Sequence, residues 1–289
     1  MFSENLIEFA SSYWVHDLSP FLWQFPAPYS DWGPGGIRWY GVSYLMGFIS
    51  AGILLKIAWK RGKSPYDQEQ VMNLLTFQIL GVLLGGRIGY AILYQGEKLL
   101  NDPLLILRVW EGGMASHGGF IGVCIATLWY ARHSKQSPFP IGDLIVYIVP
   151  PGLFFGRIAN FINGELWGRT TEIKWGVLFP NALGFAEGVA RHPSQLYAAI
   201  TEGLVPFIFI QWRFWKTKIT SRCPGVLSGE FLIIYSVARI FNEFFREPDA
   251  SLILGMTRGQ FYSLFLFAGG LFLIFISLKR SNSKEKYLF

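Results

Sequence analysis

Long apolar stretches separated by short polar segments dominate this chain. They lie at 37–59, 71–94, 113–131, 141–162, 195–214, 226–246 and 258–278. Each is close to the roughly 20 residues that an α-helix needs to cross a bilayer. The pattern therefore predicts an all-α, polytopic membrane protein with seven transmembrane helices.

The segments outside these stretches divide the chain into parts. Residues 1–36 lack the basic, apolar and small-residue order of a signal peptide but contain several tryptophans, which favours a segment lying in the membrane interface. The transmembrane domain is expected at 37–278, and its loop 163–194 is rich in turn-forming residues that predict a small extracytoplasmic head. Residues 279–289 form a cytoplasmic tail.

Lys and Arg are distributed unequally between the two sides of the predicted bundle. The segments that follow the first, third, fifth and seventh apolar stretches carry the larger share. Because short cytoplasmic loops are enriched in Lys and Arg, these segments are predicted to be cytoplasmic. The N-terminus and the head then face outside, and the C-terminus faces the cytoplasm.

The composition agrees with a membrane location. Hydrophobic residues make up 52% of the chain and charged residues 15%, whereas soluble domains contain about 25% charged residues. The net charge of +6 is explained by cytoplasmic loops beside acidic membrane lipids, so no nucleic-acid partner is expected. Cys124 and Cys223 cannot make a disulfide framework.

When the basic residues at the ends of the apolar stretches are counted with the loops, four arginines remain inside: Arg38, Arg87, Arg157 and Arg239. An arginine at mid-bilayer costs at least about 2.5–3.5 kcal/mol, so such residues normally face a bundle interior and mark function or a buried pair. In the predicted orientation, each lies toward the outer end of its helix. Their convergence on one leaflet predicts an anionic ligand there.

Helical spacing supports this convergence. Arg239 and Glu243 are four residues apart, Arg246 follows on the same face, and Arg157 and Asn160 are one turn apart. Arginine binds phosphate through a bidentate fork, so these residues predict a phosphate pocket. The alternative is that Glu243 only neutralises Arg239 or Arg246.

His117 lies among glycines at the expected outer end of the third helix, at the depth of the arginines. A histidine at a membrane interface suits a general base near neutral pH. The alternative is a packing histidine held by hydrogen bonds. The shared depth favours the functional interpretation.

The remaining motifs indicate packing or exclude whole classes of chemistry. Gly81, Gly85 and Gly89 recur at every fourth position and predict close helix packing. No HExxH, P-loop or GxSxG motif stands in a usable context, so metal, nucleotide and acyl-serine chemistry have no support.

Several stretches of mixed chemistry resemble one known family. They are GGRIGY (85–90), SHGGFIG (116–122), GRIANFINGELWG (156–168), RHPSQLY (191–197) and EFFREPD (243–249). Together they resemble the prolipoprotein diacylglyceryl transferases, in order and over roughly 37–278. The third stretch looks like the signature of that family.

The resemblance implies a reaction, its partners and its place. Members of this family move the diacylglyceryl group of phosphatidylglycerol to the lipobox cysteine thiol of a prolipoprotein signal peptide, and glycerol 1-phosphate leaves. The expected location is the bacterial cytoplasmic (inner) membrane. No metal or soluble cofactor is required, and we expect a monomer.

We hypothesise the following catalytic roles. Arg157 and Arg239 hold the phosphate and stabilise the leaving group. His117 is the expected base for the incoming thiol, and Tyr40 or Tyr235 could relay the proton. A thiol of pKa about 8.5 beside arginines could also ionise without a dedicated base.

A second set of residues is expected to bind the substrate: Arg87, Asn160, Glu165, Gly168, Glu243 and Arg246. Asn160 and Glu165 would orient Arg157 and the head loop. Arg87 and Arg246 would shape the site of the lipid headgroup.

Three rival functions stay open from the residues alone: a phospholipid transferase with another leaving group, an anion transporter or channel, and a non-catalytic lipid-binding scaffold. The inner halves of the expected helices hold few polar residues, which argues against translocation. The product released, flux without a covalent product, or lipid binding without a thioether would separate them.

Overall fold

The computed structural model describes residues 13–25, 35–108, 113–248 and 250–286. They belong to two compact units. Unit 1 comprises Met1–Ser50 and Val146–Phe289, and unit 2 comprises Ala51–Ile145. Two long helices, α2 (Trp39–Lys60) and α6 (Pro138–Ile162), contribute residues to both units.

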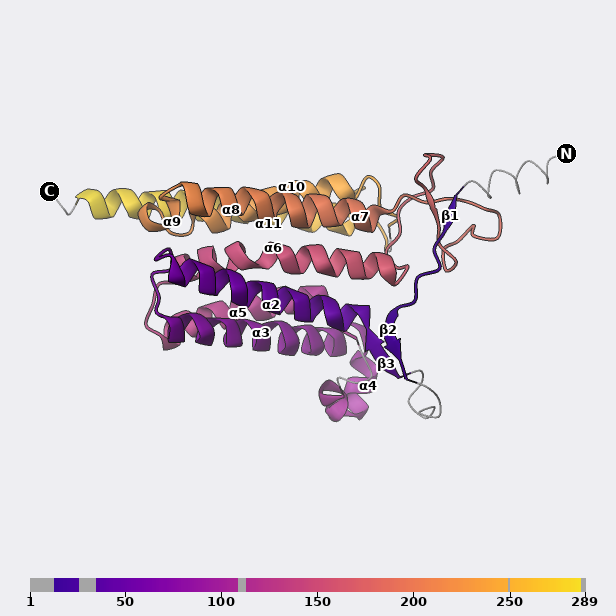
Figure 1. The fold of residues 1–289 in the computed structure, drawn as a ribbon, viewed down its shortest axis with the longest axis horizontal. Helices are drawn as coiled ribbons and strands as arrows, with labels where there is room; N and C mark the ends of the chain where they lie inside the picture. Colours follow the sequence, from indigo (N-terminus) through magenta and orange to yellow (C-terminus); the bar gives the residue numbers. More distant parts are fainter. Residues whose placement is uncertain (1–12, 26–34, 109–112, 249, 287–289) are drawn as a thin grey trace. The chain divides into compact units, whose positions relative to one another are not determined.

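Unit 2 is built around a pair of helices. Helix α3 (Gln68–Tyr94) packs along helix α5 (Ser116–His133), as Figure 1 shows. The short helix α4 (Gly96–Asn101) and the 3₁₀ turn η2 (Pro103–Leu107) connect them along the chain.

Glycines make the close approach of α3 and α5 possible. A Cβ on Gly85 would lie 2.4 Å from the carbonyl oxygen of Gly118, and a Cβ on Gly122 would lie 2.0 Å from that of Gly81. A Cβ on Gly89 would lie 2.7 Å from the Cα of Gly118. These are contacts with the main chain, which has no rotamer to change. The expected packing role of the glycine ridge is confirmed.

The second half of unit 1 consists of helical segments: α7 (Ser194–Ala198), η4 (Ala199–Leu204), α8 (Val205–Lys216), α9 (Ile219–Arg222), α10 (Val226–Asn242) and α11 (Arg258–Lys286). Segment η4 is a π-helical turn that joins α7 to α8 without a break. Helix α10 packs against α8 and α11 (Figure 1). Gly229 and Gly270 allow the second contact, since a Cβ on Gly270 would lie 2.8 Å from the Gly229 carbonyl oxygen.

Four short strands correct the all-α prediction. Strand β1 (Trp14–Val15) pairs in parallel with β4 (Val177–Leu178), and β2 (Phe21–Gln24) pairs antiparallel with β3 (Gly36–Arg38). The described residues are therefore mostly helical, with two two-stranded sheets. Strands of two to four residues carry no alternating pattern long enough to predict.

The N-terminal segment packs against the head loop, which the sequence did not predict. Tyr13 is buried with Leu178 and Ala190 in a small apolar core. His16 is also buried, and its Nε2 lies 2.7 Å from the carbonyl oxygen of Phe161. Segments far apart in the sequence are thus packed together around the loop 163–194.

Within the part of the chain that the structure describes, four helices are long and apolar enough to cross a membrane: α2, α3, α6 and residues Arg258–Asn282 of α11. Helices also lie at the other three predicted positions, as α5, the continuous α7–η4–α8 segment and α10. The chain is therefore a helical protein with several segments able to span a bilayer. The expected interfacial location of 1–36 stays a prediction, and 1–12 and 26–34 lie outside the described residues.

Candidate functional site

A small polar pocket in unit 1 brings together α6, the head loop, α7 and the end of α10. Its lining is rich in arginine and side-chain amides: Arg157, Asn160, Leu166, Ser194, Gln195, Ala198, Arg239, Asn242 and Arg246. Four predicted site residues therefore meet here, two from the proposed catalytic set and two from the substrate-binding set.

The centre of the arginine cluster is Glu202, which is not among the residues predicted from the sequence. Its carboxylate accepts two hydrogen bonds from Arg157, from Nε at 3.0 Å and from Nη2 at 2.8 Å, both to Oε2. Glu202 lies on the π-helical turn η4 and is 0% exposed. The edge of the Arg157 guanidinium that carries Nε and Nη2 is therefore already bound to a protein carboxylate.

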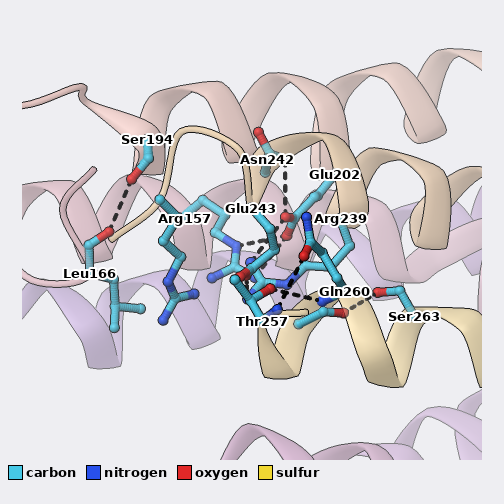
Figure 2. Close-up of polar contacts among 12 residues, drawn as sticks. Arg157, Leu166, Ser194, Glu202, Arg239, Asn242, Glu243, Thr257, Gln260 and Ser263 are labelled. Carbon is cyan, nitrogen blue, oxygen red and sulfur yellow. Dashed lines mark hydrogen bonds and ion pairs between the residues drawn. The ribbon is translucent and has the colours of Figure 1, made fainter. Parts of the chain in front are cut away.

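The second oxygen of Glu202 binds the other side of the cluster, as Figure 2 shows. Oε1 accepts from Arg239 Nη1 at 3.4 Å and from Asn242 Nδ2 at 3.0 Å. Asn242 Nδ2 also donates to Thr201 Oγ1 at 2.6 Å. One buried carboxylate thus bridges the two arginines that the sequence predicted as phosphate ligands.

Glu243 forms an ion pair with Arg239, with 2.5 Å between Oε1 and Nη2. This is one of the two pairings that we considered as an alternative to ligand binding. Glu243 lies against the first turn of α11, where a Cβ on Gly259 would lie 2.3 Å from Oε1. A helix N-terminus carries partial positive charge, which stabilises a carboxylate. Thr257 and Gln260 cap that helix end reciprocally.

Glu165 is linked to Asn160, its predicted partner. Its Oε1 accepts from Asn160 Nδ2 at 2.8 Å, and its backbone carbonyl accepts from Gln195 Nε2 at 2.7 Å. Tyr40 interacts with Asn160, and Tyr235 interacts with Arg157. The polar residues of α6 are therefore connected to the start of the head loop.

Gly168 lies at a crossing of three main-chain segments. Its N–H donates to the His192 carbonyl at 2.9 Å, and it forms an isolated bridge with Arg246. A Cβ at this position would lie 2.4 Å from the His192 carbonyl oxygen and 2.6 Å from that of Phe245. Close packing of the backbone therefore explains the glycine, and its expected contact with substrate stays a prediction.

His192 belongs to an aromatic cluster at the base of the head. Its Nδ1 lies 3.3 Å from the Tyr197 hydroxyl, which accepts a hydrogen bond from Trp175 Nε1 at 2.8 Å. Its ring packs edge-on against Phe245. Burial lowers the pKa of His192 below its usual value, so the structure favours the neutral form.

Arg38 and Arg87 make contacts that the sequence did not predict. Arg38 ends strand β3 instead of lying in the first helix, with its guanidinium carbon 5.0 Å from the Phe21 ring centroid. Arg87 is buried in unit 2 and donates to main-chain carbonyls, including those of Leu105 at 2.7 Å and Arg108 at 2.6 Å. These bonds fasten the η2 segment to α3. A headgroup role for Arg87 stays a prediction.

His117 lies in the first turn of α5 and is exposed. It belongs to unit 2, whereas the arginine cluster belongs to unit 1. Its role as a base stays a prediction.

The family model described as prolipoprotein diacylglyceryl transferase matches residues 29–276. The chain belongs to the prolipoprotein diacylglyceryl transferase family. It is 44% identical to the phosphatidylglycerol–prolipoprotein diacylglyceryl transferase of Oleidesulfovibrio alaskensis, over 89% of this chain and 94% of that protein. The proteins of the same name from Pseudoalteromonas atlantica and Vibrio cholerae are each 43% identical, over 88% of this chain and 89% and 92% of their own lengths.

The pocket of this diacylglyceryl transferase family member is suited to bind an anion. Arg157 and Arg239 are balanced by Glu202 and Glu243, and Arg246 adds a third cation to the lining. Each guanidinium has five N–H donors, so binding to a carboxylate leaves others that can reach a ligand. The side chains of Arg157 and Arg239 keep 20% and 15% of their surface exposed, whereas that of Glu202 keeps none. The two guanidinium groups are therefore accessible from the pocket, whereas the Glu202 carboxylate that binds them is buried.

Proposed function

We propose that this protein transfers the diacylglyceryl group of phosphatidylglycerol to the lipobox cysteine thiol of prolipoproteins and releases glycerol 1-phosphate. The observation that carries the proposal is the meeting of Arg157 and Arg239 in one pocket of a chain that belongs to this family. Relatives that are 43–44% identical over most of their length carry the name of this activity.

The reaction requires one bond to form and one to break. The cysteine sulfur attacks the carbon of the diacylglyceryl group that bears the phosphate, and the bond from this carbon to the phosphate oxygen breaks. The oxygen keeps the electron pair, so negative charge develops on departing glycerol 1-phosphate. The thiol must lose its proton, because the thiolate is the nucleophile.

The arginines would act on the leaving group. Donors that are already oriented stabilise charge where it develops, at little reorganisation cost. Arg157 and Arg239 are held by carboxylates on one side and exposed to the pocket on the other. We expect their remaining N–H groups and Arg246 to bind the phosphate oxygens, with Asn160 and Glu165 fixing the wall beside Arg157.

The topology completes the proposal. Seven helices would cross the bacterial inner membrane, with the N-terminus and the head outside and the C-terminus in the cytoplasm. The four helices long and apolar enough to span, and the distribution of Lys and Arg in the loops, support this arrangement. Anionic lipid in the outer leaflet and the signal-peptide cysteine would then meet at the same depth. We propose that the protein acts as a monomer.

His117 is the proposed base, with Tyr40 or Tyr235 as a relay. Replacing His117 by Gln removes the imidazole nitrogen that would accept the thiol proton but keeps a polar side chain of similar length. We expect transfer to fall about 100-fold or more, the usual contribution of a general base, and the acidic limb of the rate–pH profile to disappear. Activity with an unchanged profile would exclude His117 as the base.

One incubation tests the proposed function. Purified protein in detergent is mixed with phosphatidylglycerol and a peptide that contains a lipobox cysteine. We expect the thiol to gain the mass of one diacylglyceryl group and glycerol 1-phosphate to be released in equal amount. A peptide with serine in place of cysteine is the control. Lipid binding without a thioether would indicate a scaffold, and anion flux in proteoliposomes without a product would indicate a transporter.

A further inference from the structure

Glu202 is a fully buried carboxylate inside a helix that is otherwise mostly apolar. A buried charge is costly unless it is paired and hydrogen-bonded. Glu202 meets this requirement through two guanidinium groups and one side-chain amide. The buried Glu202 carboxylate, whose desolvation costs free energy, therefore contacts both of the proposed phosphate ligands, Arg157 and Arg239.

We propose that Glu202 is a positioning residue that fixes Arg157 and Arg239 for phosphate binding, an inference that rests on the proposed function. With no exposed surface, its carboxylate does not contact the substrate. It acts through the arginines, one oxygen holding each. The spacing of the two oxygens of one carboxylate thereby sets the spacing of the two guanidinium groups.

The π-helical turn is the element that delivers Glu202 to the arginines. Gly203 presses directly onto α6, where a Cβ would lie 2.7 Å from the Cα of Phe154. Phe154 is three residues before Arg157 and shares its helical face. The close approach at Gly203 therefore places the neighbouring carboxylate beside Arg157. π-Turns are rare and frequently occur at functional sites.

Asn242 fixes the same carboxylate from α10. Its Nδ2 donates both to Thr201 Oγ1 and to Glu202 Oε1, which are side chains of consecutive residues on η4. Arg239 lies one turn earlier on α10. Glu202 thus connects α6, η4 and α10 at one point, so a small displacement of its carboxylate would move both guanidinium groups.

A second ion pair in the same unit provides a matched control. Arg213 of α8 binds Glu230 of α10, with Nε 2.8 Å from Oε2 and a further contact from Nη2 to Oε1. It joins α10 to α8, the helix that continues from η4, through the same pair of chemical groups. Neither residue lines the arginine pocket.

The test compares Glu202→Asp and Glu202→Gln with Glu230→Asp and Glu230→Gln. Asp keeps the charge but withdraws the carboxylate by one methylene. Because a misplacement of about 1 Å can cost 100-fold, we expect Glu202→Asp to lower kcat about 100-fold and glycerol 1-phosphate affinity about tenfold. The thermal midpoint should stay close to that of Glu230→Asp. Both Glu230 variants should keep kcat within about threefold of the parent, as expected for a site remote from the chemistry.

The outcomes are separable. If Glu202→Gln does not fold, the Asp variant decides. A folded Glu202→Asp variant with kcat and glycerol 1-phosphate affinity like those of Glu230→Asp would overturn the positioning role. A wild-type protein that binds glycerol 1-phosphate but forms no thioether would overturn the proposed function instead, and loss of that binding in Glu202→Asp would still support the positioning role.

Discussion

Replacing Arg157 or Arg239 by lysine is expected to lower kcat for diacylglyceryl transfer by about 100-fold or more, the cost of removing one preorganised donor at developing charge. The change keeps the positive charge and most of the side-chain length. What it removes is the planar set of donors. The measurement is thioether formation on a lipobox peptide at saturating phosphatidylglycerol.

The contacts of Arg157 explain why a single cationic nitrogen is insufficient. Two of its nitrogens, Nε and Nη2, are hydrogen-bonded to Glu202. Lysine offers a point charge on a flexible chain. Its ammonium would have to choose between the buried carboxylate and the lipid phosphate, whereas a guanidinium can bind both at once. We therefore expect a loss of kcat larger than the change in KM, since the leaving group gains its charge in the transition state.

Arg213→Lys is the control for this substitution. Arg213 also binds a glutamate through two nitrogens, but it is absent from the pocket lining. We expect this variant to keep its activity within about threefold, because it touches neither substrate nor leaving group. Wild-type turnover in Arg157→Lys or Arg239→Lys would show that charge alone suffices and would contradict the oriented-donor mechanism.

The sequence predicted the positions of the long helices and the meeting of Arg157 with Arg239. Apolar length is a strong signal because a bilayer imposes it on each helix separately. The predicted convergence of four arginines rested on alternating helix direction, and the pocket contains two of them, Arg157 and Arg239. The first inference depends on each segment separately, and the second depends on the order and direction of the segments.

Glu202 was missed although a signal was present. It is the one acidic residue in the apolar stretch 195–214, and a carboxylate within such a stretch requires a partner. Its partners Arg157 and Arg239 are 45 and 37 residues away, so no spacing rule joins them. The arginines alone therefore do not identify the acid that bridges them.

The small sheets and the bonds of Arg87 could not be predicted for a different reason. Strand β1 consists of two residues and pairs with a strand that begins only at Val177. Arg87 is satisfied by main-chain carbonyls, which every residue carries. Both kinds of contact use main-chain groups, so the type of the partner residue does not indicate them. They are visible only in the three-dimensional structure.

Gly168→Ala is expected to lower the thermal stability and the transferase activity together. The added Cβ would meet the carbonyl oxygens of His192 and Phe245 at 2.4 and 2.6 Å, and these atoms belong to the main chain. Overpacking a buried site of this kind costs about 1–3 kcal/mol. The displaced segments lead directly to Ser194 and Arg246, which line the arginine pocket, so we expect kcat/KM to fall at least about tenfold in proportion to the loss of oriented donors.

Gly269→Ala is the matched control, because a Cβ there meets nothing within 4 Å. It should leave activity unchanged and slightly favour helix α11, since alanine is a better helix former than glycine by about 1 kcal/mol.

The melting temperature and the phosphatidylglycerol kinetics of Gly168→Ala together distinguish a packing role of Gly168 from direct contact with the lipid. A variant with the parent's melting temperature but weakened phosphatidylglycerol binding would indicate direct contact with the lipid. A variant unchanged in both would show that the crossing at Gly168 can open without moving the pocket. A parallel fall in melting temperature and kcat/KM is what the packed main chain at this position predicts.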